Sequence, residues 1–149
     1  ETEVPQALKE LQAFEHAQLC MPGVVALQTK KFTTYEEAAK EMERLNHELS
    51  TMNHELSGVA QIIICDDASF AAASLKNYLW ITYTRCNPSH DVYGIDAFVQ
   101  HKHWGCNGPV VFDVRLKPHN APVLEKDAAV EKRVDRLFAK GGSLEGIEG

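Results

Sequence analysis

The 149-residue sequence contains no apolar run that approaches the roughly 20 residues needed to span a bilayer. It also has no excess of positive charge, because its net charge is −6 at pH 7. Nucleic acids and anionic membranes attract basic surfaces, so this charge argues against both as general partners. The opening segment ETEVPQALKELQ is acidic and amphipathic, unlike a signal peptide. We therefore expect a cytoplasmic protein with no membrane span and no nucleic-acid partner.

Phosphate-binding loops and disulfide frameworks are also missing from the sequence. No stretch matches the glycine-rich G-x-G-x-x-G or P-loop patterns. The four cysteines, Cys20, Cys65, Cys86 and Cys106, are widely spaced among apolar neighbours. This spacing favours buried free thiols in a reducing compartment over a disulfide framework. Because the chain begins without Met, we expect it to be a piece of a longer protein.

The composition, with 44% apolar and 24% charged residues, is that of an ordinary globular domain. Segments with helical and strand patterns alternate along it: helices at 5–18, 34–57, 71–85 and 128–140, and strands at 24–29, 61–65 and 110–116. This order predicts the α/β fold class, as a single three-layer α/β/α domain with a mainly parallel sheet. We expect residues 1–20 to form a helical lead-in, residues 21–145 the α/β domain, and residues 146–149 a flexible tail.

The chain is organised around the stretch from Gln61 to Pro88. Its first five residues, QIIIC, form a continuous apolar run that predicts a strand buried on both faces. Asp66 and Asp67 follow directly and can cap the next helix, which must end before Pro88. Acidic groups are therefore expected at the carboxyl end of a buried strand, where open α/β sheets usually bind their ligands.

Two helical segments carry clear apolar stripes. The first follows a capping box at Thr34–Glu37 and ends near Gly58, and its stripe comprises Ala38, Met42, Leu45, Leu49, Met52 and Leu56. A repeated NHELS motif also fits a coiled coil, but two heptads are too few, so one amphipathic helix on a sheet is favoured. The second is capped by Asp127 and ends at Gly141–Gly142. Its stripe is expected to face inward, and comprises Val130, Val134, Leu137 and Phe138.

A zinc site is one candidate for chemistry. His101 and His103 would point to the same face of a strand, and Cys106 could add a thiolate ligand. No second cysteine or carboxylate pair completes a recognised spacing, however. A packed loop anchored by Trp104 is therefore the favoured interpretation.

Two other groups of residues are candidates for chemistry. Asp66 and Asp67 could bind Mg²⁺, but the further Asp and Lys of receiver-type sites have no counterparts in the right order. Helix capping and a hydrogen bond to a neighbouring loop are favoured for this pair. Cys86 and His90 have no third orienting group and no oxyanion motif, so burial of Cys86 is favoured. We assign no catalytic, cofactor-binding or metal-binding residue to this chain.

Short motifs occur in a fixed order along the second half of the chain: CDD at 65–67, YLW at 78–80, TRCNP at 84–88 and GPVVFDVRLKP at 108–118. Together they resemble the C-terminal domain of the UbiD family, the prenylated-FMN-dependent decarboxylases and carboxylases. The resemblance covers about residues 20–145. Ala68 and Ile81 depart from the family pattern, so the branch stays open, with the phenylphosphate-carboxylase-like enzymes as one candidate.

The resemblance implies a lyase that removes CO₂ from, or adds it to, small aromatic or unsaturated acids. Prenylated FMN, a divalent metal (Mn) and the catalytic groups would come from N-terminal domains of the same chain. This domain would supply a wall of the active site and a surface for a homo-oligomer, and would be inactive alone. Arg85 is expected to form a structural ion pair with Asp66 or Asp67.

Two interpretations from other classes compete with this one. The first is a free-standing, non-catalytic α/β interaction or regulatory domain, which is consistent with the lack of an active site within the chain. The second is a small zinc-binding module built on His101, His103 and Cys106. Metal analysis of the purified protein would separate the second from the others.

Overall fold

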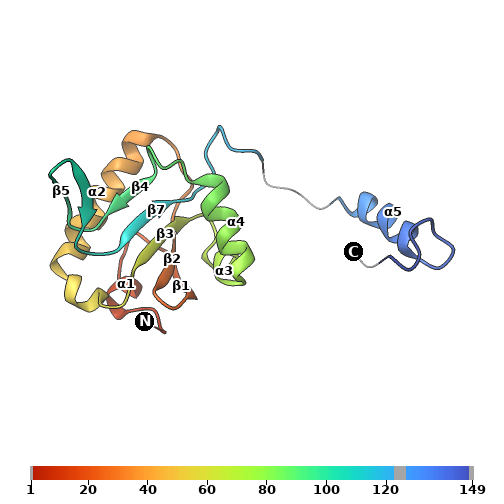
Figure 1. Cartoon of the computed structure of the whole chain (residues 1–149), viewed down its shortest axis with the longest axis horizontal. Coiled ribbons are helices and arrows are strands. Elements are labelled where there is room, and N and C mark those ends of the chain that lie inside the picture. The colour runs from red at the N-terminus through yellow and green to blue at the C-terminus, as the bar shows by residue number, and fades with distance from the viewer. Residues whose placement is uncertain (1, 123–126, 148–149) are drawn as a thin grey trace.

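The computed structural model describes residues 2–122 and 127–147. The chain forms an α/β fold, as predicted, with a five-stranded sheet, a separate two-stranded hairpin and five α-helices among the described residues (Figure 1). The strands are β1 (His16–Met21), β2 (Val24–Gln28), β3 (Gln61–Cys65), β4 (Val92–Gly94), β5 (Ala97–Gln100), β6 (His103–Cys106) and β7 (Val110–Asp113). The helices are α1 (Gln6–Lys9), α2 (Tyr35–Thr51), the 3-10 turn η1 (Asn53–Leu56), α3 (Ala68–Ala72), α4 (Leu75–Arg85) and α5 (Ala128–Phe138). Within the described ranges, no helix is long and apolar enough to cross a bilayer.

The five-stranded sheet is mixed. Its strand order is β1-β2-β3-β7-β4, and the three central strands are parallel to one another. Both edge strands, β1 and β4, run antiparallel to their neighbours. The expectation of a mainly parallel sheet was therefore wrong at its edges. Both edge strands are partly exposed, so neither carries the continuous apolar run that identified the central strands.

The predicted helix at 5–18 is replaced by a single helical turn and a strand. Only Gln6–Lys9 is helical, and it places Leu8 in the core, together with Leu11 just beyond it. From His16 onward the chain pairs with β2 through a tight turn that contains Gly23 at φ +80°. The ladder of hydrogen bonds to β2 outweighs the weak helical pattern of this segment.

The core consists of two clusters that share the strands. Alternate residues of β2 and β3 point to opposite faces of the sheet. One set, represented by Leu27 and Ile62, packs with α1 and α2. The other set, represented by Ala26 and Ile63, packs with α3 and α4. All three isoleucines of β3 are fully buried, so the prediction of a strand buried on both faces is confirmed.

The long predicted helix is confirmed in its position and stripe, but it ends earlier. Thr34 caps α2 by accepting a hydrogen bond from the backbone N–H of Glu37. The side chain of Glu37 bonds the hydroxyl of Thr33, so only half of the predicted capping box forms. At Met52 the backbone leaves helical geometry, and η1 completes the segment. The stripe residues described as buried are Ala38, Met42, Leu45, Leu49 and Leu56.

The hairpin of β5 and β6 corrects another prediction. Its two-residue turn, His101–Lys102, has φ angles of +50° and +67°, as the preferred hairpin turns require. Trp104 on β6 is 51% exposed, so it does not anchor a packed loop.

The four cysteines are free, as expected, but only Cys65 is buried and the other three are half-buried. The flexible tail predicted at 146–149 lies in part outside the described residues.

α5 begins where the sequence predicted, but its apolar stripe does not face the core. Asp127 caps it through hydrogen bonds from the backbone N–H groups of Ala129 and Val130. No residue of α5, which is described in full, is buried. Figure 1 shows the helix standing apart from the sheet, on the side of α3 and α4. The prediction that its apolar stripe faces inward is therefore wrong for this chain, because no core element lies against it.

Candidate functional site

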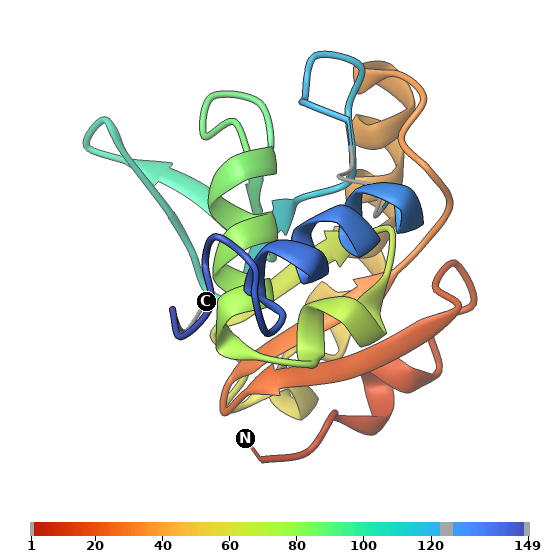
Figure 2. The ribbon, with the colours of Figure 1, turned by 90° about the vertical axis from the view of Figure 1, so that its right-hand side faces the viewer.

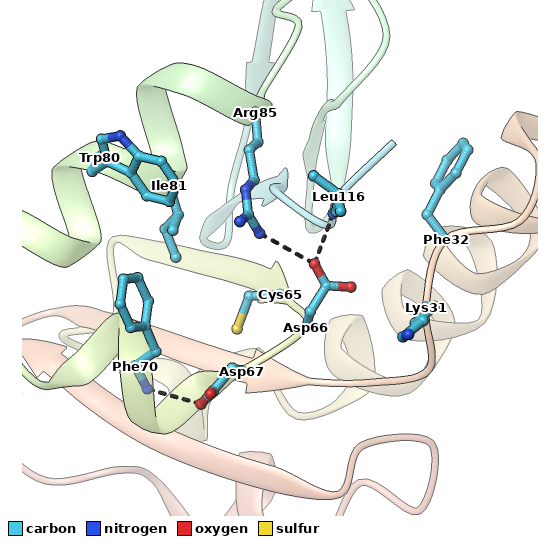
Figure 3. A pocket seen from close by; sticks show the side chains of 10 residues that line it. All are labelled: Lys31, Phe32, Cys65, Asp66, Asp67, Phe70, Trp80, Ile81, Arg85 and Leu116. Carbon is cyan, nitrogen blue, oxygen red and sulfur yellow. Dashed lines mark hydrogen bonds and ion pairs between the residues drawn. The ribbon is translucent and has the colours of Figure 1, made fainter. Parts of the chain in front are cut away.

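A largely apolar pocket lies at the carboxyl end of β3, between α3, α4 and the loop after β2 (Figure 3). Its volume is about 420 Å³. Aromatic and aliphatic side chains line most of it, and four charged residues stand among them: Lys31, Asp66, Asp67 and Arg85. A cleft of this kind, apolar with a few polar groups, is typical of small-molecule sites. Its position agrees with the sequence-based expectation for the acidic strand end.

Asp66 holds two neighbouring segments at the pocket wall. Its Oδ2 atom accepts a hydrogen bond from the backbone N–H of Leu116 at 2.7 Å. The same oxygen lies 3.3 Å from Nη1 of Arg85, as the dashed lines of Figure 3 show. Sequence reasoning left the partner of Arg85 open between two aspartates, and the structure assigns it to Asp66. The expected bond to a neighbouring loop is also made by this residue.

Asp67 accepts its hydrogen bond from a different backbone segment than Asp66 does. Its Oδ1 atom accepts a hydrogen bond from the backbone N–H of Phe70 at 2.8 Å and so caps α3. The helix that follows the aspartates is thus the short α3, while α4 starts later and is capped by Ser74. Each aspartate therefore bonds a separate backbone segment. This agrees with the structural roles favoured from the sequence.

An aromatic wall faces the charged residues across the pocket. The rings of Phe70 and Trp80 meet edge to face, with centroids 6.3 Å apart. The guanidinium carbon of Arg85 lies 5.3 Å from the centre of the Trp80 ring. Arg85 is therefore held on one side by a cation–π contact and on the other by the carboxylate of Asp66. The pocket offers a planar aromatic surface next to a fixed positive charge.

The thiol at the pocket floor is not poised for chemistry. Burial raises the pKa of Cys65 to about 12. Burial likewise raises the pKa of Cys86 to about 11, so neither thiol is ionised near neutral pH. His90, the base considered for Cys86, has its ring nitrogen 2.7 Å from the hydroxyl of Ser89. Neither thiol is therefore a candidate nucleophile.

A second charged site follows β7, and sequence reasoning missed it. Arg115 bonds Asp113 through Nη2 at 2.6 Å and Glu41 through Nη1 at 2.9 Å. Lys117 lies 3.3 Å from Oδ2 of Asp91 and also donates to the backbone oxygen of Asp113 at 2.7 Å. All of these side chains except Glu41 are at most 1% exposed. We call these five residues the buried ion cluster.

In the buried ion cluster, the acidic side chains offset the cost of burying the charge of Arg115. Burial disfavours the charged guanidinium, but the hydrogen bonds and charges of Asp113 and Glu41 together outweigh it. The pKa of Arg115 is therefore raised above its ordinary value. The alternation of charged and apolar residues in FDVRLK was the available sequence signal, because charges at every second position of a strand share one face.

The histidines proposed for zinc lie on the β5–β6 hairpin. His101 occupies its turn, and His103 begins β6. Among the described residues, no group of three or more His, Cys, Asp or Glu side chains is placed to hold a metal ion. The structure thus brings no third ligand to this pair.

The sequence is similar to part of a decarboxylase subunit. Over 77 residues, or 52% of the chain, it is 29% identical to a 4-hydroxybenzoate decarboxylase subunit of Chlamydia pneumoniae. The chain is a partial homologue of this decarboxylase. The similarity covers 13% of that protein's length, and it bears out the resemblance to the UbiD family as a relation to part of such enzymes.

The chain aligns with vanillic acid decarboxylase of Sedimentibacter hydroxybenzoicus with a TM-score of 0.42 and 14% identity. That alignment covers 76% of this chain and 25% of the decarboxylase chain. No protein-family model matches the sequence.

Proposed function

We propose that this chain is the C-terminal domain of a UbiD-like carboxy-lyase that acts on aromatic or unsaturated acids. The observation that carries the proposal is the 77-residue similarity to the 4-hydroxybenzoate decarboxylase of Chlamydia pneumoniae. Because that similarity covers 13% of the relative, the chemistry requires protein beyond this domain. Hydroxybenzoic acids are the first substrates to test, and the enzyme is expected in the cytoplasm.

The domain's role in this proposal is to close one side of the active site and to join subunits. Support comes from the pocket after β3, whose aromatic wall of Phe70 and Trp80 stands beside the charge of Arg85. An aromatic acid can pack its ring on such a wall and direct its carboxylate to a guanidinium. We further propose that the sheet lies between two helical layers, with α1 and α2 on one face and α3 and α4 on the other.

The described residues do not fit the cofactors that the family uses. They contain no group of three or more His, Cys, Asp or Glu side chains placed to hold a metal ion, so none of them is assigned to manganese. The chain also has no glycine-rich loop to hold a flavin phosphate. Prenylated FMN and the metal would therefore be held by the N-terminal domains, and no residue here is assigned to either.

The test is to isolate the cellular species that contains this chain, by means of an affinity tag on that protein. Its subunit mass, flavin absorbance and release of CO₂ from 4-hydroxybenzoate are then measured. We expect a polypeptide or complex several times larger than 16.6 kDa that carries a flavin and releases CO₂. The 149-residue chain produced alone should be inactive in the same assay.

A free-standing interaction domain is the second candidate, and the exposed apolar side chains of α4 and α5 favour it. In that case the tagged species would have the mass of this chain or a small multiple of it. It would carry no flavin and release no CO₂. That result would rule out the carboxy-lyase proposal and leave the interaction domain.

A further inference from the structure

The pocket after β3 and the buried ion cluster share one segment of the chain. Asp113, Arg115 and Lys117 belong to the cluster, and the two residues between them face the other way. Val114 packs in the core with α3 and α4, and Leu116 lines the pocket. The segment thus continues beyond β7 with the alternation of side chains that is typical of a strand. The cluster therefore lies directly behind one wall of the pocket.

A second wall of the pocket is formed by residues 29–34, which connect β2 to α2 and are here called the β2–α2 loop. Lys31 and Phe32 of this loop line the pocket, across from the aromatic wall of Phe70 and Trp80 (Figure 3). Figures 1 and 2 show the loop running beside the segment that follows β7. The loop contains no helix or strand, so its position depends on contacts with its surroundings.

Two cations of the buried ion cluster hold the β2–α2 loop. Nη1 of Arg115 donates a hydrogen bond to the backbone oxygen of Lys30 at 3.2 Å. The guanidinium carbon of Arg115 lies 5.7 Å from the centre of the Phe32 ring, and Nζ of Lys117 lies 5.4 Å from it. Both cations are at most 1% exposed, and cation–π contacts are stronger when the cation is shielded from water. The loop is therefore held on both sides of Lys31.

Glu41 connects the β2–α2 loop, α2 and the buried ion cluster through one carboxylate. Its Oε2 atom lies 2.9 Å from Nη1 of Arg115, and its Oε1 atom lies 3.1 Å from Nζ of Lys30. Glu41 belongs to α2 and is not among the residues that line the pocket. Its removal therefore changes the support of the loop without changing any group on the pocket walls.

The opposite side of the pocket is attached to the same segment after β7. Asp66, which holds Arg85 at 3.3 Å, also accepts the hydrogen bond from the backbone N–H of Leu116 at 2.7 Å. Leu116 directly follows Arg115, which holds the β2–α2 loop. The segment from Arg115 to Lys117 is therefore connected to both sides of the pocket and sets the separation between them.

We propose that the buried ion cluster sets the width of the pocket after β3, with Arg115 and Glu41 as positioning residues that hold the β2–α2 loop. The inference rests on the proposed function in one respect, because it takes an aromatic carboxylate as the molecule that binds there. A wall that is fixed before binding does not have to be ordered by the ligand, and this raises affinity. Charges that never touch the bound molecule would thus control how tightly it binds.

The first experiment measures the order of the β2–α2 loop without any ligand, by ¹⁵N relaxation of the backbone of Lys31 and Phe32 in the 149-residue chain. We expect order parameters of about 0.85, which are typical of rigid backbone, and a fall to about 0.6 in Glu41→Ala. Glu48→Ala is the matched control, because it removes an exposed carboxylate from the same helix two turns later and should leave the loop rigid. A mobile loop in the unchanged chain, or a rigid loop in Glu41→Ala, would overturn the proposal.

The second experiment measures the affinity of the same chain for 4-hydroxybenzoate, through the amide signals of Lys31, Phe70 and Trp80. A loop that is in its binding position for a fifth to a tenth of the time raises the apparent dissociation constant about fivefold to tenfold, which is the effect expected in Glu41→Ala. Loss of a negative charge alone would strengthen the binding of an anion, so weaker binding reports the position of the loop. Unchanged or tighter binding in Glu41→Ala would contradict the proposal. Failure of the unchanged chain to bind would also contradict it, because a wall fixed by this chain needs no other domain.

Arg115→Lys tests the other positioning residue. It keeps a positive charge beside Asp113 but loses the planar guanidinium, and with it the bond to the backbone oxygen of Lys30. Circular dichroism would establish that the variant is folded, and the order of the loop and the affinity should then change in the same direction as in Glu41→Ala. A rigid loop with unchanged affinity would contradict the role of Arg115. None of these measurements involves release of CO₂, so failure of the proposed function and failure of this inference give different results.

Discussion

Two ion pairs lie after neighbouring parallel strands and differ in how much water reaches them. After β3, the side chains of Arg85 and Asp66 are 12% and 23% exposed at the wall of an open pocket. After β7, those of Lys117 and Asp91 are 0% and 1% exposed. The first pair is open to molecules that enter the pocket. Separating the second pair leaves a charge buried without compensation, which is costly.

Burial distinguishes charges that stabilise the fold from charges that a bound molecule can reach. The buried ion cluster joins α2, β7 and the loop after α4, and its charges are satisfied by one another. The pocket pair joins α4 to the end of β3 but keeps one side open to a molecule in the cavity. Mutations can measure this difference directly, since the two sites should respond very differently to the loss of one charge.

The largest effect is expected for Lys117→Met, which keeps the length of the side chain and removes its charge. Asp91 would then be buried without its cation, and stability should fall by about 3–5 kcal/mol. Urea unfolding followed by circular dichroism measures this loss. Lys30→Met is the matched control, because Lys30 pairs with Glu41 while 61% exposed, and it should cost less than about 1 kcal/mol. Equal losses in the two variants would break the comparison.

The pocket pair should give an intermediate effect. Arg85→Ala removes both the ion pair with Asp66 and the cation–π contact with Trp80, and should lower stability by about 1–2 kcal/mol. Thermal unfolding would show a lower melting temperature. Arg85→Lys keeps the charge without the planar group and should fall between the two. An unchanged melting temperature in Arg85→Ala would show that the pair contributes nothing to stability.

Asp67 tests whether the second aspartate acts by its charge or as a cap. Asp67→Ala removes the acceptor for the N–H of Phe70 and should cost about 1 kcal/mol. Asp67→Asn keeps an acceptor at the same place without the charge, and its stability should stay close to that of the unchanged protein. If Asn is as damaging as Ala, the carboxylate charge matters, and the capping role alone is insufficient.

The smallest effect concerns pH. Burial raises the pKa of the Cys65 thiol to about 12, while in the unfolded chain it ionises near 9.0. Since the unfolded state alone loses this proton between these values, stability falls as pH rises above about 8. At pH 9 the loss is about 0.4 kcal/mol for this thiol. Unfolding at pH 7 and 9 would measure the difference, and Cys65→Ala should have a smaller pH dependence. A pH dependence equal to that of the unchanged protein would contradict the shift.

The sequence predicted the parts of the fold that depend on local patterns. The continuous apolar run of β3 and the apolar stripe of α2 determined these elements, and both are buried as predicted. The pairing of Arg85 with an aspartate was also predicted, because Arg85 lies only 19 residues after Asp66 along the chain. These features need little knowledge of which distant segments meet.

The sequence could not predict features that depend on distant contacts. Lys117 and Asp91 look like surface residues in a sequence, and only the meeting of two loops buries them. The apolar residues of α4 on both sides gave no sign of which side faces out. For α5, the stripe was correctly identified, but an inward direction presupposed a core that this chain does not place against it.

The position of β7 has a consequence for the newly made protein. β7 is the last strand of the sheet along the chain, yet it lies between β3 and β4. Until Val110–Asp113 has left the ribosome, β3 therefore has an unpaired edge beside its three isoleucines. An exposed apolar edge of this kind can pair with other chains and aggregate. Translation that stalls between β3 and β7 would prolong this state, and chaperones that cover unpaired strand edges would be needed most during that interval.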